Sequence, residues 1–153
     1  VPGTATPKHV FNNGEYLETE FDRINKRITI VRRKVAQGGK VGQALWSIDL
    51  DSTYNLLTLN SEQSLFIVGS AVYDARTGKK AFSFPGKGTF CGFSNTLIAQ
   101  ATLTRLYDTR TGKLLTTIDV DPGDKVLSLS PKRTYIILDK RGVIRLFRIQ
   151  TSK

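Results

Sequence analysis

Few residues in this chain have the types and spacing that catalysis requires. The 153 residues include one histidine, His9, and one cysteine, Cys91. A serine–histidine–aspartate arrangement therefore has a single candidate base, and nothing around His9 supports that role. The usual ligand sets of a structural zinc site need more cysteine and histidine than the chain contains. We expect His9 on the surface, Cys91 packed as a small hydrophobic residue, and no bound cofactor.

The densest group of carboxylates does not complete a metal-binding loop either. Asp119, Asp121 and Asp124 lie in the segment DVDPGD. Calcium loops space their oxygen ligands in a similar way, but the distal glutamate that completes them is missing here. A Pro-Gly turn with capping aspartates is the simpler interpretation. Together with the lone histidine and cysteine, this predicts that the protein is not an enzyme.

Positive charge is the chemistry that the chain does carry. The formal net charge is +10, and residues 86–153 hold 12 basic and 5 acidic side chains. Such an excess attracts phosphate backbones or acidic proteins, although it also simply keeps a protein soluble. No aromatic RNA-binding motif or base-reading helix accompanies it. We predict a partner-facing surface built from cations beside one apolar strand and in the two turns around another: Arg32, Arg33, Lys132, Arg133, Lys140 and Arg141.

The elements that position these residues are predicted to be strands from end to end. Short apolar or alternating runs end repeatedly in Gly, Pro, Asn or Asp, which is typical of half-buried strands. The connections are too short for the crossover helix of a parallel sheet, so successive strands should be antiparallel neighbours. The expected strands are 8–12, 15–21, 27–33, 44–50, 54–59, 64–69, 70–74, 80–84, 89–93, 96–101, 104–108, 114–119, 126–130, 134–138 and 143–149.

An internal repeat organises these strands. Residues 72–84 read VYDARTGKKAFSF, and residues 106–118 read LYDTRTGKLLTTI, at a period of 34. Repeats of this length indicate stacked units that cannot bury their faces alone. In each copy, Asp can bond to the turn backbone and Gly supplies a positive φ. The residues that define the repeat, including a looser third copy near the end of the chain, are Tyr73, Asp74, Gly78, Tyr107, Asp108, Gly112 and Phe147.

This repeat resembles the end of a WD repeat, whose usual wording is close to V-W-D-x-x-T-G-K. Tyr73, Tyr107 and Phe147 stand where that family usually has Trp. Residues 128–149 also resemble the family's S-P-D-G turn and the strand after it. The Gly-His dipeptide is absent, so the buried tetrad of many WD blades is absent too. The resemblance covers 54–149 well and 1–53 poorly, and it implies radially arranged four-stranded blades in which the three aromatics pack between blades.

The expected fold class is therefore all-β, a propeller-like array of about three to four antiparallel four-stranded blades. Residues 1–53 would form a divergent first blade or an N-terminal extension, and 54–153 the WD-repeat-like blades of one structural domain. The outer strand of the last blade is missing from the pattern, which predicts an incomplete propeller: either part of a longer protein, or a chain that pairs its open edge with a partner. A small β-barrel or sandwich is the alternative fold.

These patterns favour a non-catalytic scaffold that binds other protein subunits inside a larger assembly. The alternative is a basic component of a ribonucleoprotein complex that contacts RNA, and an acidic protein is the other partner considered. A third interpretation, an enzyme of the quinoprotein-like propeller type, lacks a convergent acid–base set. No apolar run approaches the roughly 20 residues of a membrane helix. We expect an intracellular protein, cytoplasmic or nuclear, with no small-molecule substrate and no membrane partner.

Overall fold

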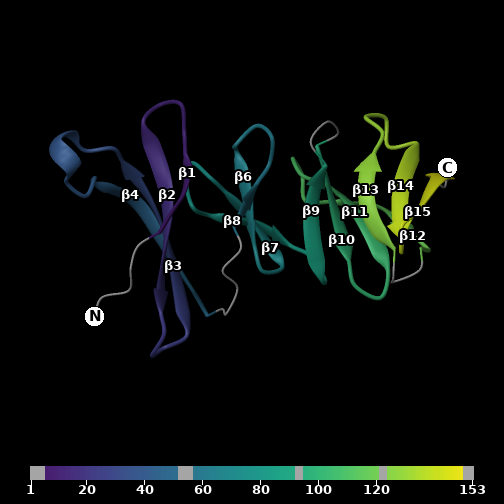
Figure 1. Ribbon diagram of the computed structural model, residues 1–153, viewed down its shortest axis with the longest axis horizontal. Coiled ribbons are helices and arrows are strands. Elements are labelled where there is room, and N and C mark those ends of the chain that lie inside the picture. The colour runs from purple at the N-terminus through teal and green to yellow at the C-terminus, as the bar shows by residue number, and fades with distance from the viewer. Residues whose placement is uncertain (1–5, 52–56, 92–94, 121–123, 150–153) are drawn as a thin grey trace. The chain divides into compact units, whose positions relative to one another are not determined.

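The computed structural model describes residues 6–51, 57–91, 95–120 and 124–149, and strands dominate them (Figure 1). The other regular element is a short 3-10 turn, η1, at Gln37–Gly39. None of the described helices is long and apolar enough to cross a membrane. The strands are β1 (Thr6–Val10), β2 (Glu15–Asp22), β3 (Arg27–Lys34), β4 (Ala44–Asp51), β5 (Thr58–Leu59), β6 (Leu65–Val68), β7 (Ala71–Asp74), β8 (Lys80–Ser83), β9 (Lys87–Cys91), β10 (Thr96–Gln100), β11 (Thr104–Asp108), β12 (Leu114–Ile118), β13 (Lys125–Leu129), β14 (Tyr135–Lys140) and β15 (Val143–Arg148).

The strands form four antiparallel sheets in which neighbours in sequence are neighbours in space. Three sheets have four strands, in the orders β1-β2-β3-β4, β5-β6-β7-β8 and β12-β11-β10-β9. The fourth has three strands, in the order β13-β14-β15. The predicted all-β, blade-like architecture is confirmed, and so is the three-stranded last sheet within the described residues. Of the expected strand 54–59, residues 54–56 lie outside the described ranges, and Thr58–Leu59 pair with β6.

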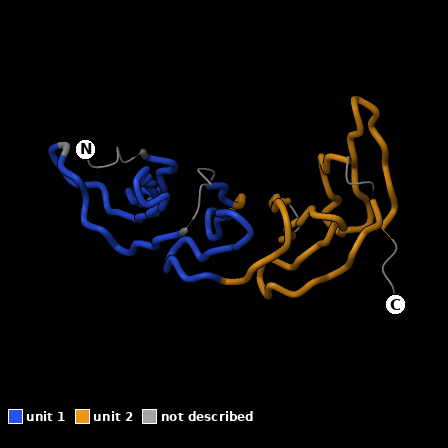
Figure 2. The backbone as a smooth tube through the Cα atoms, turned by 90° about the horizontal axis from the view of Figure 1, so that it is seen from below, with its two compact units in different colours: residues 1–59, 63–80 blue, residues 60–62, 81–153 orange. Residues whose placement is uncertain are grey.

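The chain divides into two compact units, which Figure 2 colours separately. Unit 1 comprises residues 1–59 and 63–80, and unit 2 comprises residues 60–62 and 81–153. Each unit has a hydrophobic cluster of its own.

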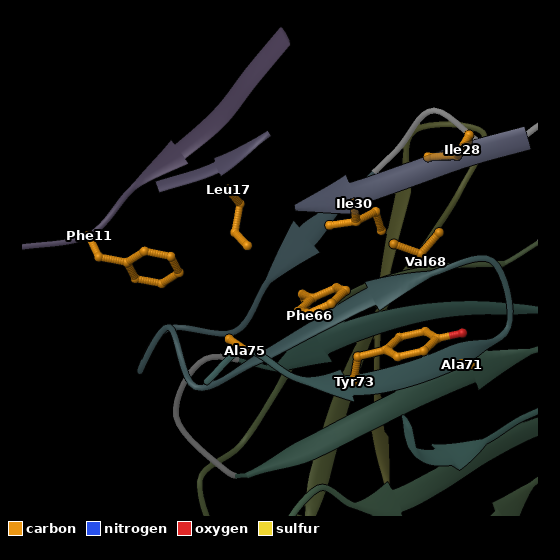
Figure 3. Packing of buried hydrophobic residues seen from close by; sticks show 9 residues of the cluster. All are labelled: Phe11, Leu17, Ile28, Ile30, Phe66, Val68, Ala71, Tyr73 and Ala75. Atoms are coloured by element: carbon orange, nitrogen blue, oxygen red, sulfur yellow. The ribbon is translucent and has the colours of Figure 1, made fainter. Parts of the chain in front are cut away.

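The core of unit 1 follows from the alternation along its strands. In β3, Ile28 and Ile30 point to one face because residues two apart share a face of a pleated strand. That face packs with Leu17 of β2, Phe66 of β6 and Tyr73 of β7 (Figure 3). Leu17, Ile30 and Phe66 are fully buried. Full burial of such side chains contributes about 1.5–3 kcal/mol each, which makes this cluster the main stabilising contact of the unit.

The core of unit 2 joins its two sheets in the same way. Ile136 and Leu138 lie two residues apart on β14 and are fully buried. They belong to one cluster with Ile98 of β10 and Leu106 of β11, which themselves pair across the β10–β11 ladder. One face of the β9–β12 sheet is therefore covered by one face of the β13–β15 sheet.

Candidate interaction surfaces

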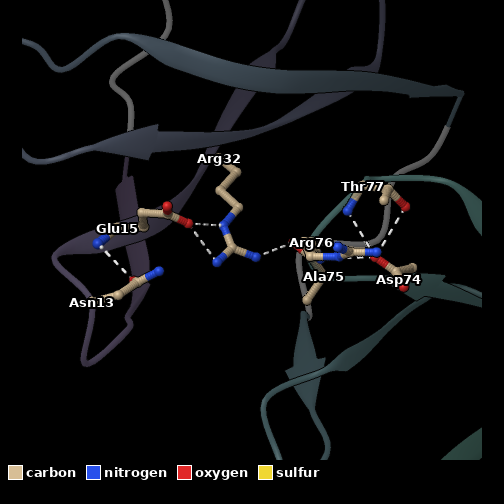
Figure 4. A network of polar contacts seen from close by, with 7 residues as sticks. All are labelled: Asn13, Glu15, Arg32, Asp74, Ala75, Arg76 and Thr77. Atoms are coloured by element: carbon tan, nitrogen blue, oxygen red, sulfur yellow. Dashed lines mark hydrogen bonds and ion pairs between the residues drawn. The ribbon is translucent and has the colours of Figure 1, made fainter.

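The repeated turn is built by the aspartate that ends β7. The Asp74 Oδ1 atom accepts hydrogen bonds from the backbone N–H groups of Arg76 (2.9 Å) and Thr77 (2.7 Å) and from the Thr77 hydroxyl (3.0 Å) (Figure 4). The Gly78 N–H donates to the Asp74 carbonyl at 2.8 Å, and Gly78 has a φ of 71°. The carboxylate thus satisfies turn donors that would otherwise need water, which explains the Asp-x-x-Thr-Gly wording.

The second copy repeats this geometry at Asp108. Its Oδ1 accepts from the N–H groups of Arg110 (2.8 Å) and Thr111 (3.2 Å), and Gly112 donates to its carbonyl at 2.8 Å. Arg133 adds an ion pair to the carboxylate at 3.6 Å. Burial raises the pKa of the Asp108 carboxyl, but the two N–H donors and the nearby Arg133 and Arg110 charges outweigh burial and hold that pKa below its usual value.

Each turn glycine also makes room for an aromatic ring from an earlier strand. A Cβ atom added to Gly78 would lie 2.8 Å from two ring atoms of Trp46 on β4. A Cβ atom added to Gly112 would lie 3.0 Å from Phe82 on β8. In both copies of the repeat, the glycine at this turn position therefore lies against an aromatic ring. The sequence analysis explained each glycine by its positive φ alone. The aromatic residue some 30 positions earlier was the signal that the glycine also makes room for a ring.

The repeat aromatics take three different environments. Tyr73 is buried and stacks on Phe66, with ring centroids 5.3 Å apart, and Phe66 stacks in turn on Trp46 at 5.9 Å. Tyr107 is half-buried and stacks on Phe82 at 6.1 Å. Phe147 is exposed. The position 34 residues after Phe82 is Thr116, so the β12 strand offers no ring against which Phe147 could stack.

The structure gives Arg32 a role inside unit 1 rather than on a partner-facing surface. Its side chain is buried, and its guanidinium donates from Nε to Glu15 Oε2 at 2.6 Å and from Nη1 to the Ala75 carbonyl (Figure 4). The guanidinium carbon lies 4.1 Å from the Phe11 ring centroid. Arg32 is in phase with Ile28 and Ile30, so the period of β3 places it on the core face. The predicted place of Arg32 on a partner-facing surface is therefore wrong, and the alternation along β3 was the signal in the sequence that could have shown its burial.

Arg33 points to the opposite face of β3 and is also engaged. It pairs with Glu18 and lies 3.9 Å from Glu20, and it donates to the Gly42 carbonyl at 3.2 Å. The hydrogen bond to Glu18 raises the pKa of the Arg33 guanidinium. The two arginines that β3 contributes to the predicted surface are therefore both paired within unit 1.

The four cations predicted in unit 2 do not form one cluster. Lys132 and Arg133 lie in the turn between β13 and β14, whereas Lys140 and Arg141 lie at the turn between β14 and β15. Consecutive turns of an antiparallel sheet lie at opposite ends of the strand that they share. These two turns therefore do not adjoin, and the prediction that their cations form one surface is wrong. Lys132 and Arg141 are exposed. Arg133 donates a hydrogen bond to the Thr96 hydroxyl at 2.7 Å and forms an ion pair with Asp108.

The candidate catalytic and metal residues have structural partners. His9 is half-buried on β1, rather than on the surface as expected, and its ring forms a T-shaped pair with the Phe11 ring, with the ring centroids 4.8 Å apart. Burial raises the pKa of the Cys91 thiol to about 11, as for a packed rather than reactive cysteine. Asp124 is buried and pairs with Arg145, so it does more than cap a turn. Asp121 lies outside the described residues. Those residues contain no cluster of metal-ligating side chains.

The clearest unpartnered surface lies on β15, the last described strand (Figure 1). Over its whole length β15 pairs with β14, and among the described strands none pairs with its other side. We call that side, over Val143–Arg148, the β15 edge. Large apolar side chains are exposed on β15 and on the two other strands of its sheet: Val143, Ile144, Leu146, Phe147, Tyr135 and Leu127. Exposed apolar side chains gathered on one three-stranded sheet mark a candidate interaction surface.

Solved structures show the same fold. A structure titled "Crystal Structure of Mitotic Checkpoint Complex" matches 98% of this chain and 50% of its own chain, with a TM-score of 0.56 at 16% identity. The computationally designed Ika8 protein matches 92% and 44%, with a TM-score of 0.56 at 21% identity. The β-propeller domain of the Trilobed protease from Pyrococcus furiosus matches 97% and 55%, with a TM-score of 0.52 at 13% identity. The chain spans about half the length of these structures.

The fold class is thus an all-β array of blades of the β-propeller type. The antiparallel sheets, the repeated turn and the match to a propeller domain all lead to this class. Neither protein-family models nor curated proteins match the sequence.

Proposed function

We propose that this chain is a non-catalytic, WD-repeat-like scaffold module that binds other proteins inside a larger intracellular assembly. The observation that carries this proposal is the β15 edge, where an unpaired strand and exposed apolar side chains coincide. A matched solved structure is by its title a complex, which supports protein partners for a fold of this kind.

The alternative is a ribonucleoprotein component that contacts RNA through exposed cations such as Lys132 and Arg141. The net charge of +10 favours it. Lys132 and Arg141 lie at opposite ends of β14, and Arg32 and Arg33 pair within unit 1, so these predicted cations form no concentrated basic site among the described residues.

The native mass of the protein in cell extracts distinguishes the two functions. A scaffold gives a native mass well above that of its own chain in denaturing electrophoresis, and this mass survives nuclease. Mass spectrometry of the co-purified chains then identifies its partners. Collapse to a small species on nuclease treatment would favour the ribonucleoprotein. A monomeric native mass in both samples would rule out both functions.

A further inference from the structure

We propose that one end of unit 1 binds an acidic segment of another protein that also contains apolar residues. The binding surface is formed by the loop 35–43, which joins β3 to β4, and by the turn 75–79, which joins β7 to β8. The inference rests on the proposed scaffold function and adds to it a second surface with a partner of stated chemistry. We call the exposed cations of this surface the basic patch: Lys34, Lys40, Arg76, Lys79 and Lys80.

Two contacts bring the loop and the turn to the same end of unit 1. Arg32, near the end of β3, donates a hydrogen bond from its guanidinium to the Ala75 carbonyl in the turn (Figure 4). Trp46, near the start of β4, lies against Gly78 of the turn, where an added Cβ would be 2.8 Å from its ring. The turn therefore contacts both of the strands between which the loop runs.

The loop is an insertion relative to the repeat, and its base is held on the sheet. It has nine residues, whereas the equivalent turns 75–79 and 109–113 have five each. The Lys34 N–H donates to the Gln43 carbonyl at 3.1 Å, and the Val35 N–H donates to the Gly14 carbonyl at 2.8 Å. Insertions in single repeats form loops on one face, which is often the binding face.

The basic patch concentrates positive charge. Residues 34–43 and 75–80 contain five basic side chains and no acidic one, and all five are exposed. The carboxylates of the adjoining strands are already engaged: Glu15 pairs with Arg32, and Asp74 accepts hydrogen bonds from backbone N–H groups of the turn. Such a surface attracts carboxylates and repels a second copy of itself.

Exposed aliphatic side chains beside these cations favour a protein over a nucleic acid. Val35 and Val41 of the loop are 60% and 76% exposed. Single-stranded RNA is bound by cations together with aromatic rings on which its bases stack, and residues 34–43 and 75–80 contain no aromatic residue. A peptide with apolar side chains between its carboxylates would bury the two valines and meet the cations at the same time.

Selection of displayed peptides on the immobilised protein tests the proposal. We expect the retained peptides to combine several Asp or Glu residues with apolar ones. A selected peptide, when bound, should shift the amide NMR signals of residues 34–43 and 75–80.

Two matched charge reversals then locate the binding site. K40E/K79E should weaken binding of the selected peptide at least about tenfold, because it replaces two attractive charges by repulsive ones. R23E/K26E changes two exposed cations in the turn between β2 and β3, at the opposite end of the same sheet, and should leave binding unchanged. V41S, which keeps the charge, should weaken binding about threefold by removing apolar contact. Circular dichroism establishes that the variants remain folded.

Several outcomes would overturn the inference. Retained peptides without acidic residues, or unchanged binding by V41S, would refute the partner's chemistry. Equal losses in the two charge reversals, or unchanged NMR signals at both segments, would refute the location. An oligouridylate, or vesicles containing phosphatidylserine, that bind more tightly than the peptide and lose binding only in K40E/K79E would make the patch a site for RNA or for a membrane surface instead.

The scaffold function is tested separately from this inference. None of these results alters the native mass of the assembly, so the scaffold function survives the failure of the basic patch as a peptide site. A monomeric native mass would refute the scaffold function itself.

Discussion

At the scale of single residues, the turn glycines combine two constraints that are usually separate. Gly78 and Gly112 need positive φ, and each lies against an aromatic ring. A positive φ alone costs an L-residue about 1–2 kcal/mol, whereas displacing a packed ring adds a further term. Such positions should tolerate no substitution, and a turn glycine in open space should tolerate alanine better.

Gly78→Ala should therefore destabilise the protein more than Gly14→Ala. Both glycines have φ near +70°, at 71° and 75°, but an added Cβ meets Trp46 at 2.8 Å in the first case and nothing within 4 Å in the second. We expect a loss of about 3 kcal/mol for Gly78→Ala and about 1 kcal/mol for Gly14→Ala in urea unfolding. Equal losses would show that the contact with Trp46 costs nothing.

Asp108 should make stability depend on pH in the acid range. Its pKa is lowered in the fold from the ordinary value of 3.8, so its carboxylate stabilises the fold above that value, and the contribution is lost as pH falls through the folded pKa. We expect Asp108→Asn to cost about 1 kcal/mol near pH 6, with the difference from the unmodified protein shrinking toward about pH 2.

Urea unfolding across this pH range measures the effect, with Asp119→Asn as the exposed control. A difference between Asp108→Asn and the unmodified protein that stays constant with pH would show that the hydrogen bonds from Arg110 and Thr111 do not depend on the charge of Asp108.

At the scale of elements, Arg32 joins a strand of the first sheet to the turn that follows β7. Its guanidinium connects Glu15 of β2 with the Ala75 carbonyl, both in unit 1. Arg32→Met keeps much of the volume but leaves the Glu15 carboxylate, which is 19% exposed, without this partner. Removing one member of a buried pair costs several kcal/mol, so we expect a loss on the order of 3 kcal/mol.

The double variant Arg32→Met/Glu15→Gln tests whether this loss comes from the uncompensated charge. The second substitution should restore part of the stability, since it removes the charge that Arg32→Met leaves behind. Arg23→Met, an exposed residue in the turn after β2, should change stability by less than about 0.5 kcal/mol. Strictly additive losses in the double variant would show that Arg32 acts through its other contacts, with the Ala75 carbonyl and the Phe11 ring, and not through the charge of Glu15.

The strands were predictable from sequence because their signals are local. Alternation and turn residues lie within a few positions of each element, so β11 at Thr104–Asp108 agrees with its predicted range. The role of Arg32 was missed because its partners Glu15 and Ala75 lie 17 and 43 residues away. The run Arg32-Arg33-Lys34 looks uniformly exposed until the strand period separates it into a core side and an outer side.

The candidate site was only partly predictable for a related reason. The open last sheet follows from counting strands in the repeat, and the structure agrees with that count. The basic surface required knowing which turns adjoin, and two turns flanking one strand lie at its opposite ends. Apolar residues on both faces of 143–147 were the available signal for the β15 edge, because a strand with one solvated face alternates instead.

At the scale of the whole molecule, the net charge of +10 ensures some affinity for any polyanion, so RNA binding alone cannot decide the function. What distinguishes a site is the number of phosphate contacts that particular cations make. For single-stranded RNA, each contact contributes about 0.7 to the slope of log affinity against log salt concentration.

The last prediction compares two triple charge reversals by this slope. In the first, the β14 variant, Glu replaces Lys132, Lys140 and Arg141. In the second, the control variant, Glu replaces three exposed cations of unit 1: Arg23, Lys34 and Lys40. The first three lie at the two ends of β14, roughly 20 Å apart for a six-residue strand, so they form no single phosphate site. We therefore expect the two variants to have equal slopes. A slope lower by about 2 for the β14 variant alone would show that these three cations bind RNA together, and it would make the ribonucleoprotein the better account of this protein.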